Sequence, residues 1–402
     1  MFNKKKKFCE DCALPPVYHL RSWLEELTIV FLPLRLLGAL RKQLERIADF
    51  LLEKIFLALR LAKWQEDFPL SDFQLRTVLF ITAARGRGIK IKALYTKAGP
   101  NGVFLGQFAN GKKFRFETLP DVGFLSKYCS DLADDKKAAK KRLAKGGFPV
   151  AEGKFFWFWQ RRTALKFAKN LSYPLVVKPR SGSVARHCYT DIRSEEQLRL
   201  ALKKVFQYSP CFLVERYITG CSVYRATVVD FDNVFCCQQI PANVVGDGLH
   251  TIRYLIDQKN RLPNRGQVQQ NEFTLFQIKE DAITNELLNK LGYDFDTIVP
   301  NGERVFLQKN PFLRLGGDIA EVTDKMHPDN KKLFNDVARS FDLRLVGIDF
   351  LAQDIGASWQ EQKCAILEVN LMPCIEMHQM PSEGQPQDIA NRVVDLAMKY
   401  YQ

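Results

Sequence analysis

Apolar residues near the N-terminus of the chain recur at the spacing of amphipathic helices. Within residues 18–65, arginines and lysines fill the opposite face, and Pro33 and Gly38 divide the block into a first helix and a longer second one. We favour a helical hairpin packed on the main body. The alternative is a basic amphipathic surface that contacts an anionic membrane or mediates self-association. The apolar positions of the second helix are Leu44, Ile47, Ala48, Leu51, Leu52 and Ile55.

From residue 72 onwards the pattern changes to alternating helices and strands. The first segment predicts a helix that stops at Gly88 and a short strand after it. Two further strands flank Asn110-Gly111, the dipeptide most typical of a tight hairpin turn. A charged helix then ends at Gly146-Gly147, and Ser194 is placed to cap the start of another helix.

Short apolar runs in the rest of the chain predict buried strands. With the helices and hairpins between them, they favour a mixed α/β (α+β) fold with antiparallel hairpins rather than strict βαβ alternation. These runs are residues 175–178, 211–218, 345–355 and 363–370.

The composition is that of a globular protein with more than one core. The chain has 402 residues, of which 46% are hydrophobic and 26% charged, and this length predicts about two or three domains. The formal net charge of +14 is compatible with nucleic acid, an anionic membrane surface or anionic small ligands such as nucleotides. Residues 154–160 are dense in aromatic side chains, a pattern more typical of a core than of base stacking, so we expect no nucleic-acid partner.

Neither a signal peptide nor a membrane-spanning helix is predicted. The N-terminal MFNKKKKF does not lead into an uninterrupted apolar stretch, and residues 27–40 are broken by Pro33 and Arg35. We therefore expect a cytoplasmic protein, with peripheral contact at the inner membrane face through residues 18–65 as the alternative.

The ten cysteines have no repeating spacing. Cys9 and Cys12 form the one CxxC pair, and neither a second such pair nor a histidine pair completes a four-ligand zinc set. We interpret the cysteines as free thiols of a reducing compartment.

Two apolar strands near the C-terminus carry acidic and amide side chains. Glu368 and Asn370 are two residues apart and therefore lie on one face of their strand, and Asp349 interrupts an apolar strand upstream. If the two strands pair, these three side chains converge as oxygen ligands of the kind that Mg²⁺ prefers.

Lys178 is a complementary cation. It ends a buried strand and is followed by the Ser181-Gly182-Ser183 turn, an arrangement that suits a nucleotide phosphate. A lysine, a turn and a distant acidic set are the parts that metal-assisted phosphoryl transfer needs.

The order of several motifs resembles the ATP-grasp module of cyanophycin synthetases, and the related module of the bifunctional bacterial glutathione synthetases is similar. The resemblance runs from about residue 72 to the C-terminus. The motifs are VVKP, VERYITG, YR, PANVVGDGLHTIRYLI, GG, VTDKMHPDN, GIDF, LEVNLMP and MHQMPSEG.

The resemblance implies an ATP-grasp fold of three subdomains, with the nucleotide between two antiparallel sheets and an N-terminal helical extension added. The expected ranges are 1–70 for the extension, 71–130 for the subdomain before the ATP-grasp part and 131–402 for the ATP-grasp domain. Within the last range we expect a lid subdomain at about 131–225 and a catalytic subdomain at about 226–402. The implied reaction joins an amino-acid or peptide carboxylate to an amine through an acyl-phosphate, with release of ADP and phosphate.

The same resemblance implies roles for individual residues. Arg225, Lys178 and Arg314 are expected to act in catalysis, and ATP and Mg²⁺ (or Mn²⁺) are the expected cofactors. His250 and Arg265 lie in family-like segments without an assigned role. The expected metal ligands are Asp349, Glu368 and Asn370. The expected nucleotide ligands are Lys136, Lys140, Lys178, Gly182, Ser183, Glu215, Arg216, Tyr217, Ile218 and Ser222.

Three departures from the family pattern bear on activity. The loop after Lys178 keeps one glycine, Gly182, so we expect Arg180, Arg186 and His187 to hold phosphate by charge, or the loop to have lost its catalytic grip. Ser222 replaces an acidic residue expected to bind ribose, and the segment around Arg314 differs from the family's acceptor segment.

Two functions therefore remain open. One is the ligase, with small amino-acid or peptide substrates and a homo-oligomeric state. The other is a nucleotide-binding homologue without ligase activity. In either case, the substrates should not be copied from cyanophycin or glutathione synthesis.

Overall fold

The computed structural model describes residues 9, 15–30, 48, 51–120, 132–133, 135–180, 187–268, 270 and 272–401. These residues fall into two compact units. Unit 1 lies within residues 1–61 and 131–220, and unit 2 within residues 62–130 and 221–402. Among the described residues, no helix is both long and apolar enough to span a bilayer, and the described cysteines form no disulfide.

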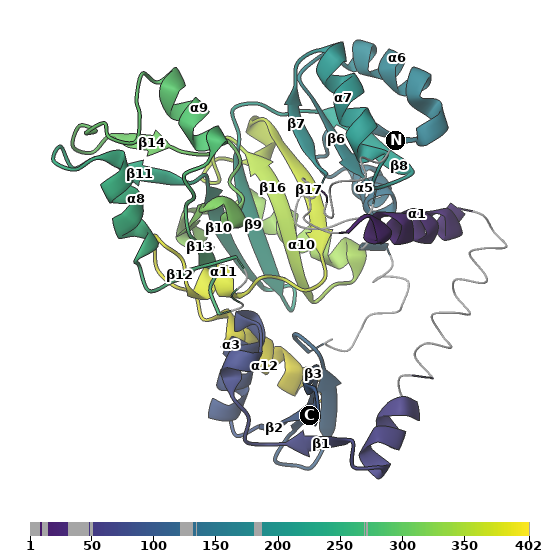
Figure 1. The fold of residues 1–402 in the computed structure, drawn as a ribbon. Coiled ribbons are helices and arrows are strands. Elements are labelled where there is room, and N and C mark those ends of the chain that lie inside the picture. Colours follow the sequence, from purple (N-terminus) through teal and green to yellow (C-terminus); the bar gives the residue numbers. More distant parts are fainter. Residues whose placement is uncertain are drawn as a thin grey trace. The chain divides into compact units, whose positions relative to one another are not determined.

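Unit 1 is a four-stranded antiparallel sheet with the order β5-β8-β6-β7; Figure 1 labels β8, β6 and β7 of this sheet. The central strand β8 is buried along five of its six residues, as expected for an apolar run between two neighbours. The apolar faces of α6 and α7 pack on the sheet around Phe156, Leu198 and Phe212. The elements are α1 (Pro16–Val30), α5 (Lys136–Lys145), β5 (Gly153–Trp157), η2 (Phe158–Gln160), α6 (Arg161–Leu171), β6 (Leu175–Pro179), β7 (Tyr189–Ile192), α7 (Glu195–Val205) and β8 (Cys211–Arg216).

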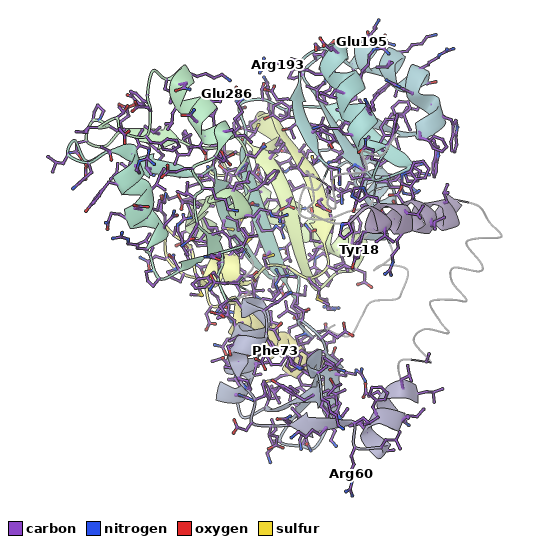
Figure 2. All side chains as sticks on the ribbon, in the orientation of Figure 1. Tyr18, Arg60, Phe73, Arg193, Glu195 and Glu286 are labelled. Carbon is purple, nitrogen blue, oxygen red and sulfur yellow. The ribbon has the colours of Figure 1, made fainter. Side chains whose placement is uncertain are left out.

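Helix starts in unit 1 follow local rules. The Ser194 hydroxyl accepts a hydrogen bond from the Gln197 amide at 3.1 Å, so the predicted N-cap of α7 is confirmed. Glu195 follows it in the first turn, where a negative charge suits the helix dipole (Figure 2). The charged helix α5 ends at Lys145, and Gly147 has a φ of 74°, a conformation that favours glycine.

The N-terminal part of unit 2 is a small antiparallel sheet, β1-β2-β3-β4, covered by α3 and by the C-terminal helix α12. Its core is rich in phenylalanines, among them Phe73 (Figure 2). The predicted hairpin turn is confirmed, since β3 and β4 flank Asn110 and Gly111. The elements are β1 (Ala62–Gln65), η1 (Leu70–Asp72), α3 (Leu75–Gly86), β2 (Lys90–Thr96), β3 (Gly99–Gln107), β4 (Lys113–Phe116) and α12 (Ile389–Tyr401).

The predicted helical block at residues 18–65 is only partly helical. Residues 51–58 are helical, but residues 62–65 form β1, which pairs antiparallel with β2. Backbone hydrogen bonds to the edge of an existing sheet override the helical pattern there. Leu51, Leu52 and Ile55 are about half exposed in the described structure, while Leu44 and Ile47 lie outside the described residues.

The larger sheet of unit 2 has the order β15-β10-β9-β16-β17 (Figure 1). All its pairs are antiparallel, so the predicted pairing of the two C-terminal strands is confirmed. Helix α10 packs against it, with Phe334 in edge contact with Phe350. The elements are β9 (Ser222–Val229), β10 (Asn233–Ile240), β15 (Asp318–Glu321), η4 (Thr323–Lys325), α10 (Pro328–Phe341), β16 (Leu345–Ala352), η5 (Trp359–Glu361), β17 (Cys364–Asn370) and α11 (Glu376–Gln379).

A third group of elements in unit 2 lies between β10 and β15 in the chain. It has its own small apolar core, centred on Ile252, Leu288 and Val305. The elements are β11 (Asn243–Val245), α8 (Ile252–Asn260), β12 (Arg265–Gly266), β13 (Leu275–Phe276), α9 (Ala282–Lys290), β14 (Arg304–Phe306) and η3 (Leu313–Leu315).

We expect Phe80→Ala to destabilise the protein by about 3–5 kcal/mol, because Phe80 is fully buried between α3 and β4 and contacts Phe116 edge-on. Urea unfolding of unit 2 measures this. The control is Leu291→Ala, at a side chain of the same unit that is 57% exposed and should change the free energy of unfolding by about 0.5 kcal/mol or less. Equal effects of the two substitutions would contradict the placement of Phe80.

Candidate active site

The sheet of unit 1 buries a carboxylate between two lysines. Lys178 on β6 and Glu215 on the neighbouring strand β8 are two residues apart in register, which places both side chains on one face. The Lys178 ammonium lies 2.6 Å from one oxygen of Glu215, and the Lys140 ammonium lies 2.5 Å from the other. The exposed fractions of the Lys140, Lys178 and Glu215 side chains are 19%, 13% and 4%.

This triad has a surplus of positive charge. Burial by itself raises the pKa of Glu215, but the two ammonium groups reverse the effect and hold the pKa below its ordinary value. Burial also lowers the pKa of Lys140, and Glu215 opposes that change. Two cations therefore share one carboxylate, a local field that attracts an anion such as a phosphate.

Helix α5 is held in place from its first turn. The Asp135 carboxylate accepts a hydrogen bond from the Lys137 amide at 2.9 Å and forms an ion pair with Arg180, just after β6. Burial opposes ionisation of Asp135, but Arg180 lowers its pKa below the usual range. Of the two predicted lysines, Lys140 therefore reaches Glu215, whereas Lys136 is the first residue of the helix and is half-buried.

The segment after Glu215 is partly engaged within the protein. The Arg216 amide donates to the Glu152 carbonyl at 2.8 Å, and the Tyr217 amide donates to the Pro174 carbonyl at 3.0 Å. The Arg216 side chain pairs with the Glu152 carboxylate at the surface. Both amides are thus engaged within unit 1 in this conformation, and the expected contacts of Glu215, Arg216, Tyr217 and Ile218 to adenine stay predictions. Ile218 follows them and is half-buried.

The loop predicted to cover phosphates is described only at its ends. Gly182, Ser183 and Arg186 lie outside the described residues. Arg180 is buried against Asp135, and His187 is buried with 3% of its surface exposed. The expectation that Arg180 and His187 hold phosphate by charge therefore does not fit their surroundings.

The larger sheet of unit 2 brings the predicted metal ligands together. Asp349 on β16 is directly opposite Glu368 on β17, and Gly347 is opposite Asn370. Directly opposed residues of an antiparallel pair project to the same face. The Asn370 amide group donates to the Asp349 carboxylate at 3.2 Å, with its nitrogen and oxygen assigned from this contact.

Arg225 faces the same group from β9, where it is opposite Asp349 in register. Its guanidinium makes a two-pronged ion pair with that carboxylate, with Nε at 2.6 Å and Nη2 at 3.0 Å. Burial and the nearby Glu368 charge raise the pKa of Asp349, although Arg225 opposes this. Burial acts against the charged form of Arg225 too, yet Asp349 raises its pKa.

Gly347 leaves room for this ion pair. A Cβ atom at residue 347 would lie 3.0 Å from Nη1 of Arg225 and 3.4 Å from Pro373. Any side chain at this position would therefore press on the guanidinium that neutralises Asp349. The glycine of the GIDF motif is explained by this close approach.

Arg76 is a positioning residue that the sequence did not reveal. From α3 it bonds the loop after β17, with contacts to the Met372 carbonyl at 3.3 Å, the Cys374 sulfur at 2.9 Å and the Glu376 carboxylate at 3.0 Å. No motif pointed to it, because the partners are about 300 residues apart in the chain. A lone arginine in a helix carries no local signal of such a contact.

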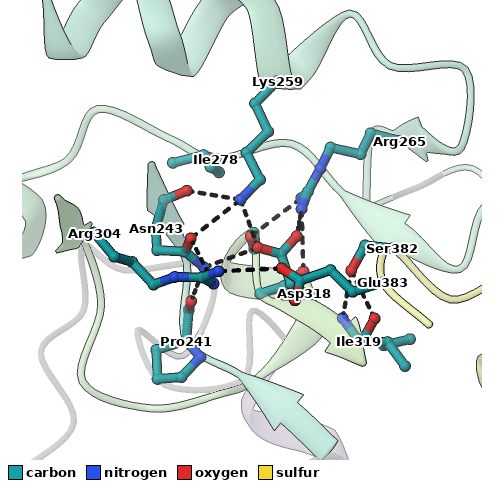
Figure 3. A network of polar contacts seen from close by, with 12 residues as sticks. Pro241, Asn243, Lys259, Arg265, Ile278, Arg304, Asp318, Ile319, Ser382 and Glu383 are labelled. Carbon is teal, nitrogen blue, oxygen red and sulfur yellow. Dashed lines mark hydrogen bonds and ion pairs between the residues drawn. The ribbon is translucent and has the colours of Figure 1, made fainter. Parts of the chain in front are cut away.

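Arg314 lies on a loop built around a buried ion pair. Arg265 is fully buried, pairs with Asp318 and donates to the Gly316 carbonyl at 3.1 Å (Figure 3). Gly316 ends the short helix that carries Arg314 and has a φ of 91°, a conformation that favours glycine. Arg314 itself is half-buried, and among the described residues its guanidinium has no ion-pair or hydrogen-bond partner.

The motifs that carry the resemblance meet around Asp318. Lys259 pairs with Asp318 at 2.5 Å, and Asn243 of the PANVV segment donates to the same carboxylate at 2.8 Å (Figure 3). Glu383, from the MPSEG segment, bonds Arg304 at 3.3 Å in the same network. One network of polar contacts thus joins three segments that are far apart in the chain.

The histidines of these motifs have structural partners. His378 is buried between Glu321 at 2.8 Å and Thr227 at 2.9 Å. His327 caps α10, as its position at a predicted helix start suggested. His250 bonds Asp247 at 2.6 Å near the surface and, with the neighbouring amides, lowers the pKa of that carboxyl to about 2. Ser222, at the start of β9, accepts a hydrogen bond from Gln238 at 3.0 Å.

The two antiparallel sheets and the polar groups on them define the class of protein: this is the ATP-grasp fold. A solved bifunctional glutathione synthetase from Pasteurella multocida is similar over 82% of this chain and 44% of its own, with a TM-score of 0.64 and 22% identity. That likeness confirms the predicted fold.

Curated relatives confirm the resemblance stated from the motifs. A cyanophycin synthetase of Trichormus variabilis is 34% identical over 293 residues, which are 73% of this chain and 32% of the relative. A glutathione biosynthesis bifunctional protein of Streptococcus thermophilus is 31% identical over 271 residues, 65% of this chain and 35% of the relative. The chain spans about a third of the length of the curated relatives that it matches. No family model matches it.

We expect Glu215→Gln to destabilise unit 1 by about 3–5 kcal/mol, because it leaves two buried ammonium groups without their carboxylate. The lowered pKa of Glu215 means that its contribution is present above its ordinary pKa, near 4.5, and is lost as the pH falls through the folded-state pKa. Unfolding of the variant should therefore depend less on pH below about 4.5.

Glu152→Gln is the matched control, since this carboxylate of the same unit pairs with Arg216 at the surface. It should change the free energy of unfolding by about 1 kcal/mol or less. Urea unfolding of both variants between neutral and acidic pH separates them. Equal loss in the two would contradict the buried triad.

Proposed function

We propose that this protein is an ATP-dependent ligase that joins the carboxylate of an amino acid or peptide to an amine through an acyl-phosphate. The observation that carries the proposal is the half-buried oxygen group formed by Asp349, Glu368 and Asn370 beside Arg225. The ATP-grasp fold and the curated relatives support the same reaction class.

The oxygen group fits a divalent cation. Asp349 and Glu368 lie directly opposite each other, and burial together with the Glu368 charge raises the pKa of Asp349, although Arg225 opposes this. A hard cation such as Mg²⁺ (or Mn²⁺) would remove the repulsion and bind carboxylate and amide oxygens. When bound, it would neutralise phosphate charge and orient the phosphates.

Lys140 and Lys178 are proposed to attract the phosphates of ATP. They share the single carboxylate of Glu215, which keeps both ammonium groups in place and leaves a net positive charge. Ser222 and Ile218 stay predicted contacts to the nucleoside.

The chemistry then requires positioning more than a nucleophilic side chain. The substrate carboxylate attacks the γ-phosphorus, ADP leaves, and the acyl-phosphate is attacked by the amine with loss of phosphate. Arg225 is suited to stabilise the transferred charge. Asp349 holds its Nε and Nη2, while Nη1 has no hydrogen-bond partner among the described residues and lies beside Gly347.

Arg314 is proposed to bind the carboxylate of the acyl donor. Its guanidinium is half-buried and is carried by a loop that Arg265 and Asp318 hold from behind. An arginine that is held in place but has no carboxylate partner among the described residues suits an anionic substrate.

The test is release of ADP and phosphate from ATP with Mg²⁺ against a matrix of amino acids and short peptides, with product masses read in parallel. Substrate-dependent release together with a condensation product supports the ligase. Tight ADP binding without turnover on any pair of substrates would instead support the nucleotide-binding homologue.

We expect Glu368→Gln to lower turnover by more than about 100-fold, because one carboxylate of the proposed metal site loses its charge. Glu361→Gln is the matched control, since Glu361 is an exposed carboxylate on the connection between the same two strands. It should retain parental turnover. Initial rates over a range of Mg²⁺ concentrations measure both, and equal activity of the two variants would show that the site is misplaced.

We expect Arg314→Ala to raise the KM for the carboxylate substrate by about 10–100-fold, the cost of a lost hydrogen bond to a charged group. The KM for ATP should be unchanged. Arg261→Ala, at an exposed arginine of the same unit, is the control and should alter neither constant. A changed KM for ATP with an unchanged KM for the carboxylate would refute this role.

Two other expectations stay predictions. A homo-oligomeric state and membrane contact through residues 18–65 are both measurable on the full chain, by light scattering and by sedimentation with anionic vesicles. The exposed apolar side chains of residues 51–59 are compatible with either.

A further inference from the structure

Unit 1 gathers a cysteine and two histidines that the proposed reaction does not use. Cys9 precedes α1, His19 lies in the first turn of α1, and His187 lies in the connection between β6 and β7. One ligand atom from each of the three lies within 4.8 Å of the other two. The exposed fractions of the histidines are 6% and 3%, and Cys9 is half-buried.

The ring of His187 is oriented for this group. Its Nδ1 lies 3.5 Å from the Tyr189 hydroxyl, and its Nε2 lies 4.0 Å from the Cys9 sulfur. A metal-binding histidine commonly has its second nitrogen held by such a partner. The backbone of His187 has a φ of 55°, a conformation that residues other than glycine adopt at a cost, which is a sign of local constraint.

Aromatic packing encloses the two imidazoles. Tyr208 stacks on His187 with a centroid distance of 4.3 Å and meets the edge of His19 at 5.4 Å. The two histidine rings are perpendicular, with centroids 5.2 Å apart. Perpendicular rings direct their nitrogens to a common point more readily than stacked rings do.

Helix α1 is also fixed on this sheet by other contacts. The Trp23 indole donates to the Phe206 carbonyl at 2.8 Å, and the buried Glu26 carboxylate accepts from the Ser209 hydroxyl at 2.7 Å. His19 is therefore presented by a helix that is held independently of any metal.

We propose that Cys9, His19 and His187 bind a zinc ion. Thiolate and imidazole ligands select zinc among the common divalent ions and do not suit Mg²⁺ or Ca²⁺, which prefer oxygen. Zinc ligands lie about 2.0–2.3 Å from the ion, so pairs of ligand atoms are about 3.3–3.8 Å apart. The observed separations need a contraction of about 1.5 Å at most to reach this geometry.

The sequence had suggested the opposite conclusion. Cys9 is the first cysteine of the CxxC pair, and no second pair completed a zinc set. The histidines come from positions 10 and 178 residues further along the chain, which no spacing rule connects. Cys12 lies outside the described residues.

Bound zinc would tie the chain before α1 to the connection between β6 and β7. The ligands belong to three separate segments of unit 1, so the ion would act as a cross-link that the unfolded chain lacks. The proposal rests on these three side chains, and neither it nor the proposed ligase activity depends on the other.

The first test measures zinc in the full chain by mass spectrometry after equilibration with chelator-buffered Zn²⁺, without ATP. We expect about one zinc per chain. Replacement by Co²⁺ should give the charge-transfer absorption of a cobalt–thiolate bond, which a site of carboxylates cannot give. Parental protein with no bound zinc, or with no thiolate band, would overturn the proposal.

The second test uses variants. Cys9→Ser should lose the thiolate band and weaken zinc binding by more than about tenfold. Cys221→Ser is the matched control, because Cys221 is a half-buried cysteine of unit 2, and it should behave as the parent. If Cys9→Ser keeps the band, the site is refuted.

Tyr189→Phe keeps the test decisive if Cys9→Ser fails to fold. It removes only the hydroxyl near Nδ1 of His187, so the band should remain while zinc affinity falls by about 10–100-fold. Zinc should also raise the thermal midpoint of the parent and the control. Unchanged affinity in Tyr189→Phe together with no thermal shift in the parent would count against the site.

Discussion

The ion pair between Arg225 and Asp349 is the interaction on which the larger sheet depends. Asp349 is directly opposite Glu368, and burial together with like-charge repulsion raises the pKa of Asp349. Arg225 faces them from the next strand, and Gly347 leaves the space that its guanidinium needs. Two carboxylates and an amide thus share one face of two paired strands, and such oxygen atoms are the ligands that a divalent ion prefers. This is the physical argument for a divalent ion at these strands.

Unit 1 contains the reverse arrangement. Glu215 is a single carboxylate between Lys140 and Lys178, so its surplus is one positive charge. Two ammonium groups beside one carboxylate suit an anion, as the oxygen group of the other sheet suits a cation. Neither group lies at an open surface, because the three side chains of the triad and the Arg225–Asp349 pair are all less than one-fifth exposed.

The motifs that carry the family resemblance contribute residues that hold the fold together. Asn243 and Glu383 come from two of them and join one network with Lys259, Arg304 and Asp318, which follows the Gly316-Gly317 pair. The polar atoms of Asn243 and Asp318 are buried and need fixed partners, so substitutions at these two positions are destabilising. Similarity in these motifs therefore reflects the scaffold of the fold. Arg314, which we propose as a substrate ligand, is carried by a segment that departs from the family pattern.

The sequence by itself determined the features that obey local rules. Period two placed Glu368 and Asn370 on one face, Ser194 was recognisable as a cap, and Asn110-Gly111 as a hairpin turn. The order of motifs indicated the fold. Tertiary structure alone decided which distant residues meet: Arg225 with Asp349, Arg76 with Glu376, and Cys9 with His19 and His187. The tertiary structure also places residues 62–65 in a strand, where the sequence pattern predicted a helix. The physical reason is that strand register and packing join residues tens to hundreds of positions apart, and neither propensity nor spacing along the chain encodes that choice.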